Sequence, residues 1–309
     1  MTDDHLTRTP PSEAHISDCS LDLVVVILTF NEESNLPACL SSISSLQRPI
    51  FLVDSGSTDA TLEVASRFQA TVLHNKFANH SAQWAWALSA IPPCHWVLGL
   101  DADQRLTPQL QAEITQLFSS QHDRLNELDG IYLRRRQIFR SRWIKHGGYY
   151  PKHLLKLFRR NSVVIDEDDL VDHHFYVNGR TTSLKNDLIE DNLKEHNINV
   201  WIDKHNRYAS LLAKEEVQRK LNAIHRPIRA SFWGNPDERT HYLKNLWARL
   251  PRYVRPSILF TYRYVIRLGF LDGEQALIFH FLQSFWFRLL VDIKISEMLK
   301  AKPAPPHHL

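Results

Sequence analysis

Short apolar runs alternate with amphipathic stretches along the first 120 residues. Residues 21–30 form a run rich in β-branched side chains, which is typical of a strand buried on both faces. Three more strands are predicted at shorter apolar runs, residues 49–53, 71–73 and 96–100. Helices are predicted where apolar residues recur every three or four positions, at residues 35–46, 58–68, 81–91 and 107–118. This alternation predicts an α/β fold with a mostly parallel, twisted sheet flanked by helices.

Carboxylates follow the most central of these strands. Asp101 and Asp103 come directly after an apolar run, and side chains two positions apart in an extended segment point the same way. The carboxyl ends of parallel strands open onto the ligand crevice of such a sheet. Mg²⁺ or Mn²⁺ suits this position, because these ions take one or two carboxylates together with substrate phosphates. The alternative is that Asp101 only ends a strand and Asp103 only begins a turn.

The middle of the chain is less regular. Short strands are predicted at residues 130–134, 154–158, 163–165 and 175–177, and a helix at residues 201–220. The Asn178-Gly179 dipeptide is a signal for a hairpin turn. Residues 131–160 contain ten Lys or Arg and no acid, so they form either a solvated face or a site for anionic phosphates.

The C-terminal part combines aromatic side chains with an excess of cations. Residues 241–300 hold nine Lys or Arg against four acids. Such helices are either ordinary core, or they lie in a membrane interface with aromatics toward the lipid and cations toward anionic headgroups. No uninterrupted run reaches the roughly 18 apolar residues that span a bilayer, so we expect peripheral contact with a membrane surface at most.

Composition narrows the class of protein. A chain of 309 residues that is 43% hydrophobic and 23% charged is globular, and a net charge of +3 does not indicate a nucleic-acid partner. Cys19, Cys39 and Cys94 are scattered and lack the spacing of a zinc site, which favours a reducing compartment. Residues 1–20 are polar, without the apolar stretch of a signal peptide, so the prediction is a cytoplasmic protein.

Three segments together carry a resemblance to a known family. They read Ile-Leu-Thr-Phe-Asn-Glu at 27–32, Val-Asp-Ser-Gly-Ser-Thr-Asp-Ala-Thr at 53–61 and Leu-Asp-Ala-Asp at 100–103. Their order, spacing and place at predicted strand ends resemble the family 2 glycosyltransferases. Residues 155–160, 204–209 and 269–273 look more loosely like the subgroup of lipopolysaccharide-core and capsule enzymes. The resemblance implies a GT-A fold, a nucleotide-diphosphate sugar donor, a divalent metal (Mg²⁺ or Mn²⁺) and inversion at the anomeric carbon.

The same resemblance implies a set of site residues. Contacts with the nucleotide sugar are implied for Thr29, Asn31, Glu32, Asp54, Ser55, Asp59 and Asp101. Asp103 would hold the metal that bridges the diphosphate, and Asp101 would face the ribose or the metal. Ser55 departs from the pattern, because the family often has a second acid at that position.

Inverting transfer needs a base that takes the proton of the acceptor hydroxyl. Related enzymes often carry a His-Glu pair before a strand and a turn glycine, and counting back from the predicted hairpin turn reaches Asp172 and His173. Asp172 is therefore the predicted base and His173 the next candidate, followed by Glu190 and Asp191. The alternative for Asp172 is an acidic loop residue paired with an arginine. A separate alternative is that His173 or His174 completes the metal shell or binds pyrophosphate.

The expected organisation is a disordered extension at 1–20, a GT-A domain at 21–225, a helical, aromatic-rich appendage at 226–300 and a disordered tail at 301–309. The expected acceptor is a hydroxyl of a lipid-linked or envelope glycan, and no nucleic acid is expected. Two other functions share these features. One is a catalytically silent nucleotide-sugar-binding subunit of a membrane assembly. The other is a metal-dependent nucleotidyltransferase, which usually brings a Gly/Lys-rich phosphate loop that is absent near Thr29.

Overall fold

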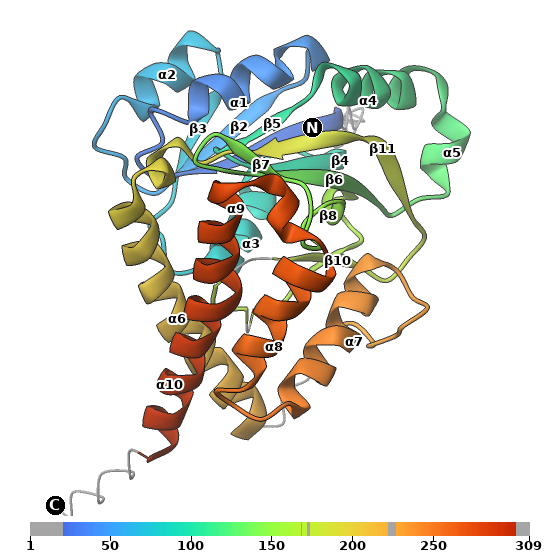
Figure 1. Cartoon of the computed structure of the whole chain (residues 1–309). Helices are drawn as coiled ribbons and strands as arrows, with labels where there is room; N and C mark the ends of the chain where they lie inside the picture. Colours follow the sequence, from blue (N-terminus) through green and yellow to red (C-terminus); the bar gives the residue numbers. More distant parts are fainter. Residues whose placement is uncertain (1–20, 168, 172–173, 222–226, 301–309) are drawn as a thin grey trace, which may run out of the picture.

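The computed structural model describes residues 21–167, 169–171, 174–221 and 227–300. A central sheet runs through the upper half of Figure 1, and the C-terminal helices extend below it. In the described residues the sheet has the order β3-β2-β1-β4-β8-β6-β11-β5, with β7 paired to β6. Its strands are β1 (Leu21–Thr29), β2 (Ile50–Asp54), β3 (Thr71–His74), β4 (Cys94–Asp101), β5 (Gln104–Leu106), β6 (Gly130–Phe139), β7 (Arg142–Ile144), β8 (Lys152–Arg159) and β11 (Thr181–Glu190). The predicted α/β architecture with a C-terminal helical part is confirmed.

The first half of the sheet is parallel and follows the sequence-based prediction. In β1 the side chains from Leu23 to Ile27 are all buried, because β1 lies between β2 and β4 with a helical layer on each face. One apolar cluster contains Leu36, and the other contains Trp84. Helices α1, α2 and α4 lie above the sheet in Figure 1, and α3 lies below it. The helices are α1 (Leu36–Ile43), α2 (Thr61–Arg67), α3 (His80–Ala90), α4 (Pro108–Ser120) and α5 (His122–Asn126).

The second half of the sheet is mixed. Strand β8 is antiparallel to β4 and β6, whereas β11 is parallel to β6 and antiparallel to β5. The predicted hairpin at Asn178-Gly179 is wrong, because β10 (Phe175–Val177) pairs with β9 (Val163–Ile165) and not with β11. Strand β11 itself was not predicted. Its register against β6 shifts between Ser183 and Asp187, and this shift breaks the alternation by which a strand is recognised.

The C-terminal helices pack on one another and on the sheet. They are α6 (Ile198–Leu221), α7 (Pro236–Arg249), α8 (Arg255–Thr261), α9 (Glu274–His280) and α10 (Phe287–Lys300), with π-helical turns η3 (Tyr262–Ile266) and η5 (Phe281–Trp286). Helices α6 and α10 share a small apolar core. The buried guanidinium of Arg255, whose Nε lies 2.9 Å from Asp292 Oδ1, joins α8 to α10. The phenol of Tyr132 donates to Asp237 Oδ2 at 2.7 Å and ties α7 to β6.

One continuous helical stretch, Glu274–Lys300, is long and apolar enough to cross a membrane by length and composition. The expectation from sequence counted uninterrupted apolar runs, whereas this stretch qualifies by a mean hydropathy that includes occasional polar residues, so the expected peripheral contact stays a prediction. A core helix of a soluble protein passes the same criterion, and Phe287, Val291 and Ile295 of this stretch are packed against α6. The predicted disordered segments, 1–20 and 301–309, lie outside the described residues. The predicted boundary after residue 225 falls there too and stays a prediction.

Candidate active site

Parallel pairing gathers the predicted polar residues at one edge of the sheet. Thr29 is the register partner of Asp54, and Leu28 is the partner of Asp101, so the carboxyl ends of β1, β2 and β4 lie side by side. The end of β11 reaches the same edge, because the backbone N–H of Asp191 donates to the carbonyl of Asp103 at 3.0 Å. The residues singled out in three separate motifs are therefore neighbours in space.

Asp54 organises the loop that follows β2. Its side chain is buried, and Oδ2 accepts from the backbone N–H groups of Gly56 and Ser57, both at 2.9 Å. Oδ1 accepts from the hydroxyls of Thr29 at 3.2 Å and Ser57 at 2.5 Å. Gly56 has a φ of 96°, a conformation that glycine adopts at no steric cost. Both oxygens of Asp54 are thus hydrogen-bonded within the loop. The contact of Asp54 with the nucleotide sugar stays a prediction.

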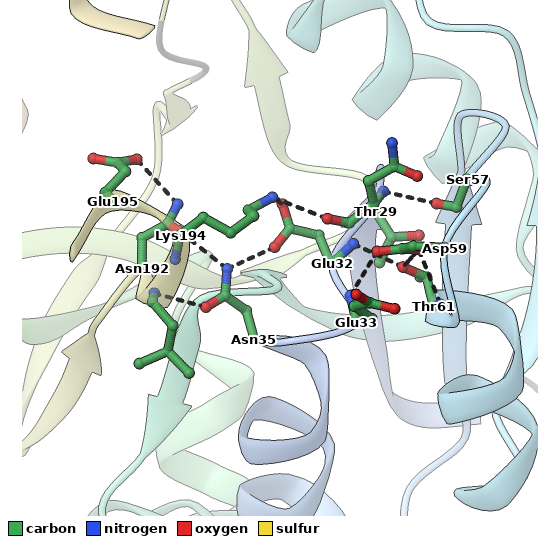
Figure 2. A network of polar contacts seen from close by, with 12 residues as sticks. Thr29, Glu32, Glu33, Asn35, Ser57, Asp59, Thr61, Asn192, Lys194 and Glu195 are labelled. Carbon is green, nitrogen blue, oxygen red and sulfur yellow. Dashed lines mark hydrogen bonds and ion pairs between the residues drawn. The ribbon is translucent and has the colours of Figure 1, made fainter. Parts of the chain in front are cut away.

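The loops after β1 and β2 are bonded to each other (Figure 2). The backbone N–H of Asn31 donates to Ser57 Oγ at 2.9 Å, and that of Glu32 donates to Thr61 Oγ1 at 2.7 Å. Asp59 accepts from the N–H of Glu33 at 3.1 Å and from Thr61. Burial acts to raise the pKa of Asp59, but these hydrogen bonds lower it by more, so the net shift is downward and Asp59 stays ionised. Asp59 therefore stabilises these two loops, residues 30–35 and 55–60, which we call the paired loops.

A third segment closes the same side of the site. Lys194, in the 3₁₀ turn η2 (Leu193–His196), forms an ion pair with Glu32 and donates to the carbonyl of Asn31 at 3.1 Å. Asn35 bridges the loops, because its Nδ2 donates to Asn192 Oδ1 at 3.1 Å and to Glu32 Oε2 at 2.7 Å. Figure 2 shows this network running from Glu195 to Ser57. Sequence analysis missed Lys194, because no local pattern links it to a partner 162 residues earlier.

Asp101 has a cationic partner that the sequence did not reveal. Lys156 of β8 is buried, and its Nζ donates to Asp101 Oδ2 at 2.8 Å. Lys156 lies in the basic segment for which phosphate binding was one alternative. The contact arises because β8 pairs with β4 in antiparallel register, with Leu157 opposite Leu98.

Asp103 is a carboxylate of the site that has no cationic partner among the described residues. Burial raises its pKa well above the usual value, and the negative charges of Glu190 and Asp101 raise it further against the opposing Lys204. Within the described part of the chain, no hydrogen bond or ion pair reaches its carboxylate oxygens. Lys204 itself forms an ion pair with Glu195, and attraction to Glu195 raises its pKa although burial opposes the charged form.

The donor set at Asp103 fits a hard divalent cation. Asp103 has no partner among the described residues and lies close to two other carboxylates, so a bound cation would stabilise its ionised form. Mg²⁺ commonly uses only one or two protein carboxylates. Among the described residues there is no cluster of three or more His, Cys, Asp or Glu with metal-binding geometry. A metal at this site would therefore take most of its ligands from phosphate and water, as Mg²⁺ does in sites that bind substrate phosphates.

Glu190 ends β11 and Asp191 follows it, beside Asp103. Glu190 accepts from Arg135 Nη1 at 2.9 Å and from Gln104 Nε2 at 2.8 Å. Asp191 is held on both oxygens, with Arg105 Nη2 at 3.1 Å and His196 Nε2 at 2.9 Å. The predicted base Asp172 and its neighbour His173 lie outside the described residues.

The chain is similar in sequence to known glycosyltransferases. The family model for glycosyl transferase family 2 matches residues 24–179, half of the chain. An uncharacterized glycosyltransferase of Rickettsia typhi is 33% identical over 94 residues, which cover 30% of this chain and 32% of that protein. One from Rickettsia bellii is 32% identical over 96 residues, covering 31% and 32% of the two chains. The match thus spans about a third of the length of these curated relatives.

Solved structures resemble the chain at low identity. TarS of S. aureus matches with a TM-score of 0.40 and 12% identity over 83% of this chain and 54% of that one. Glucosyl-3-phosphoglycerate synthase of Mycobacterium tuberculosis, solved with Mn²⁺ and uridine-diphosphate-glucose, matches with a TM-score of 0.30 and 20% identity over 38% and 44%. The matched family region contains both paired loops, Asp101, Asp103 and Lys156. On this match the chain belongs to glycosyl transferase family 2.

Proposed function

We propose that this protein transfers a sugar, with inversion, from a nucleotide-diphosphate donor to a hydroxyl of a lipid-linked or envelope-glycan acceptor. The observation that carries the proposal is the Asp103 carboxylate, which has no hydrogen-bond or ion-pair partner among the described residues and lies at the strand edge where the paired loops and Asp101 meet. A negative site of this kind beside three buried or half-buried lysines suits a metal-bound diphosphate. The lysines are Lys156, Lys194 and Lys204.

The proposed metal is Mg²⁺ or Mn²⁺, held by Asp103 with Asp101 as the second carboxylate. When bound, it supplies positive charge that stabilises the leaving diphosphate. The protein's own part is electrostatic. Lys156 offsets the charge of Asp101, and Lys204 only partly opposes the negative charges around Asp103, so the donor's phosphates meet a site that is not uniformly negative.

The proposed donor contacts come from the paired loops. Thr29, Asn31, Glu32, Asp54, Ser55 and Asp59 are all in or beside them. Ser55 Oγ accepts from Gln83 Nε2 at 3.2 Å, which links the second loop to α3. Because hydrogen bonds within and between the loops hold them in place, a donor would bind there with little reordering of the backbone.

The proposed base is a carboxylate facing the Asp101–Asp103 pair. Among the described residues Glu190 is the best candidate, because its negative charge helps to raise the pKa of Asp103, whereas that of Asp191 is not among the main causes of this shift. Both oxygens of each carboxylate accept hydrogen bonds, from Arg135 and Gln104 in Glu190 and from Arg105 and His196 in Asp191. Glu190 would accept the acceptor's proton, and Arg135 would keep it oriented. Asp172 and His173 remain the candidates from sequence.

The proposed acceptor implies contact with a membrane surface. Many apolar side chains of the C-terminal helices and of the turn before α8 are exposed, among them Tyr253, Ile258, Tyr262 and Phe281. Exposed aromatic and aliphatic side chains accompanied by cations favour peripheral binding to an anionic bilayer.

The test is to incubate the protein with a panel of nucleotide sugars and Mn²⁺ and to measure free nucleoside diphosphate, with a chelator as control. The proposal expects release that depends on the metal. Donor-induced thermal stabilisation without any release, with acceptor lipids present, would favour the silent binding subunit. Pyrophosphate release from a nucleoside triphosphate and a sugar phosphate would favour the nucleotidyltransferase.

A further inference from the structure

An apolar hairpin connects α8 and η3 to α9. We call residues 265–271 the hairpin tip. Five of its seven side chains are large, apolar and between 46% and 65% exposed: Val265, Ile266, Leu268, Phe270 and Leu271. Contiguous exposed apolar surface marks sites of interaction with another protein or with a membrane. The exposed side chains of the tip therefore indicate a binding surface for a protein or a membrane.

The tip is firmly attached to the enzyme. The buried carboxylate of Asp272 accepts from the backbone N–H groups of Lys145 at 2.8 Å and His146 at 2.7 Å, and its other oxygen lies 2.6 Å from His146 Nδ1. The N–H of Gly147 donates to the carbonyl of Arg267 at 2.9 Å. These bonds hold the tip against residues 140–148, so the exposure of its apolar side chains belongs to a defined conformation.

Cations surround the tip. Residues 140–148 and 263–272 contain five Lys or Arg, and the single acid in these segments is Asp272, which is buried and bonded to His146. Arg140, Lys145 and Arg267 are exposed. An exposed apolar surface bordered by cations is complementary to an anionic bilayer. The apolar side chains enter the boundary of the acyl chains, and the cations contact headgroup phosphates.

The tip also lies near the proposed acceptor side of the site. Strand β7, which contacts the segment after the tip, pairs with β6, and β6 pairs with β11. Gln137 of β6 is the register partner of Ile144 on one side and of Glu190 on the other. Ile144 and Glu190 are therefore two strands apart in the sheet, about 10 Å at the usual spacing between neighbouring strands. Figure 1 shows this turn of the chain, above α8 and α9, folded against β7.

We propose that the hairpin tip inserts into an anionic lipid bilayer and thereby turns the Glu190 side of the site toward the membrane surface. A lipid-linked acceptor would then reach the site without leaving the bilayer. This role for the acceptor rests on the glycosyl-transfer function proposed above, whereas the docking itself does not depend on it.

The test uses the full-length protein and phosphatidylcholine vesicles with or without phosphatidylglycerol, scored by co-sedimentation. Ile266→Asp and Leu271→Asp should each weaken binding to the anionic vesicles at least tenfold, roughly the loss expected when one buried aliphatic side chain is removed from the lipid. Arg140→Gln and Lys145→Gln should each weaken it roughly fivefold. Leu243→Asp on α7, where Leu243 is 57% exposed, is the matched control and should bind normally.

Besides a wild-type protein that does not bind the vesicles, two results would overturn the docking proposal. One is binding that the tip variants leave unchanged. The other is a dimer, seen by light scattering, that Ile266→Asp dissociates, because the occupant would then be a second copy of the chain. Stabilisation by nucleoside diphosphate with Mn²⁺, measured on every variant, separates the two proposals. Tip-dependent vesicle binding without nucleotide binding removes only the transferase function, and normal nucleotide binding without vesicle binding removes only the docking.

Discussion

The ammonium group of Lys156 donates to the carboxylate of Asp101 at 2.8 Å, so the first acid of the Asp-X-Asp motif is paired with a cation of the protein itself. The second acid, Asp103, has no such partner among the described residues and is crowded by Asp101 and Glu190. The two carboxylates are two residues apart in sequence but differ in their electrostatic surroundings. This asymmetry predicts different consequences when each is changed.

Replacing Lys156 with Met should destabilise the metal-free protein by about 1.5–3 kcal/mol, the usual contribution of a hydrogen bond to a charged group. The melting temperature should fall by a few degrees. Mn²⁺ should then raise it by more than in the wild type, because the cation replaces the lost positive charge. Lys156→Arg is the control that keeps the charge. An unchanged melting temperature and an equal Mn²⁺ effect would contradict the role assigned to this pair.

Asp103→Asn should abolish metal-dependent donor binding and sugar release while leaving the fold intact. Its raised pKa means that the ionised form is disfavoured in the folded protein, so removing the charge should leave thermal stability equal or higher near pH 7. Asp101→Asn should weaken donor binding but retain part of the activity. Titration calorimetry with Mn²⁺ and donor measures both effects. Near-normal turnover of Asp103→Asn in a chelator would refute the metal assignment.

Glu190→Gln should reduce turnover roughly 10²-fold or more, the scale of lost acid–base catalysis, with donor affinity nearly unchanged. The amide oxygen still accepts from Arg135, whereas the hydrogen bond that Glu190 accepts from Gln104 Nε2 is lost, so a thermal melt of the variant accompanies the kinetics. Asp172→Ala is the parallel test of the sequence-based candidate, and Asp191→Asn should act on stability. Single-turnover kinetics with a measured donor Kd separates these cases. If only Asp172→Ala lowers turnover, the base is Asp172 and Glu190 is a structural residue.

Histidine 280 should make folding stability depend on pH. Burial lowers the pKa of His280 to about 4 from 6.5, and Arg263 adds to this shift against the opposing Asp272. Between these values the unfolded chain binds a proton that the folded chain excludes, so stability is complete above pH 6.5 and falls toward pH 4.

The loss from this histidine should be about 2 kcal/mol between pH 7 and pH 5. Urea unfolding of His280→Phe at the two pH values should show a correspondingly flatter dependence. His122→Gln, which changes an exposed histidine, is the matched control and should keep the wild-type slope. Identical slopes for wild type and His280→Phe would mean that His280 does not carry the effect.

The sequence by itself determined the parallel half of the fold and the residues at its edge. A strand such as β1, buried on both faces, needs an unbroken apolar run, and this run is visible without any partner. Asp54, Asp101 and Asp103 were found because they end such runs. Their convergence followed from the rule that parallel strands end at one edge.

Tertiary structure decided what local patterns cannot encode. Strand β11 was missed because its register shift interrupts the two-residue period, so Glu190 was only a later candidate for the base and its effect on Asp103 was not predicted. Lys156 and Lys194 reach their partners from 55 and 162 residues away. The C-terminal helices carry apolar side chains on several faces, so periodicity alone could not distinguish core from surface. Packing against α6 buries Phe287, whereas Ile266 stays in solvent, because only folded neighbours remove a side chain from water.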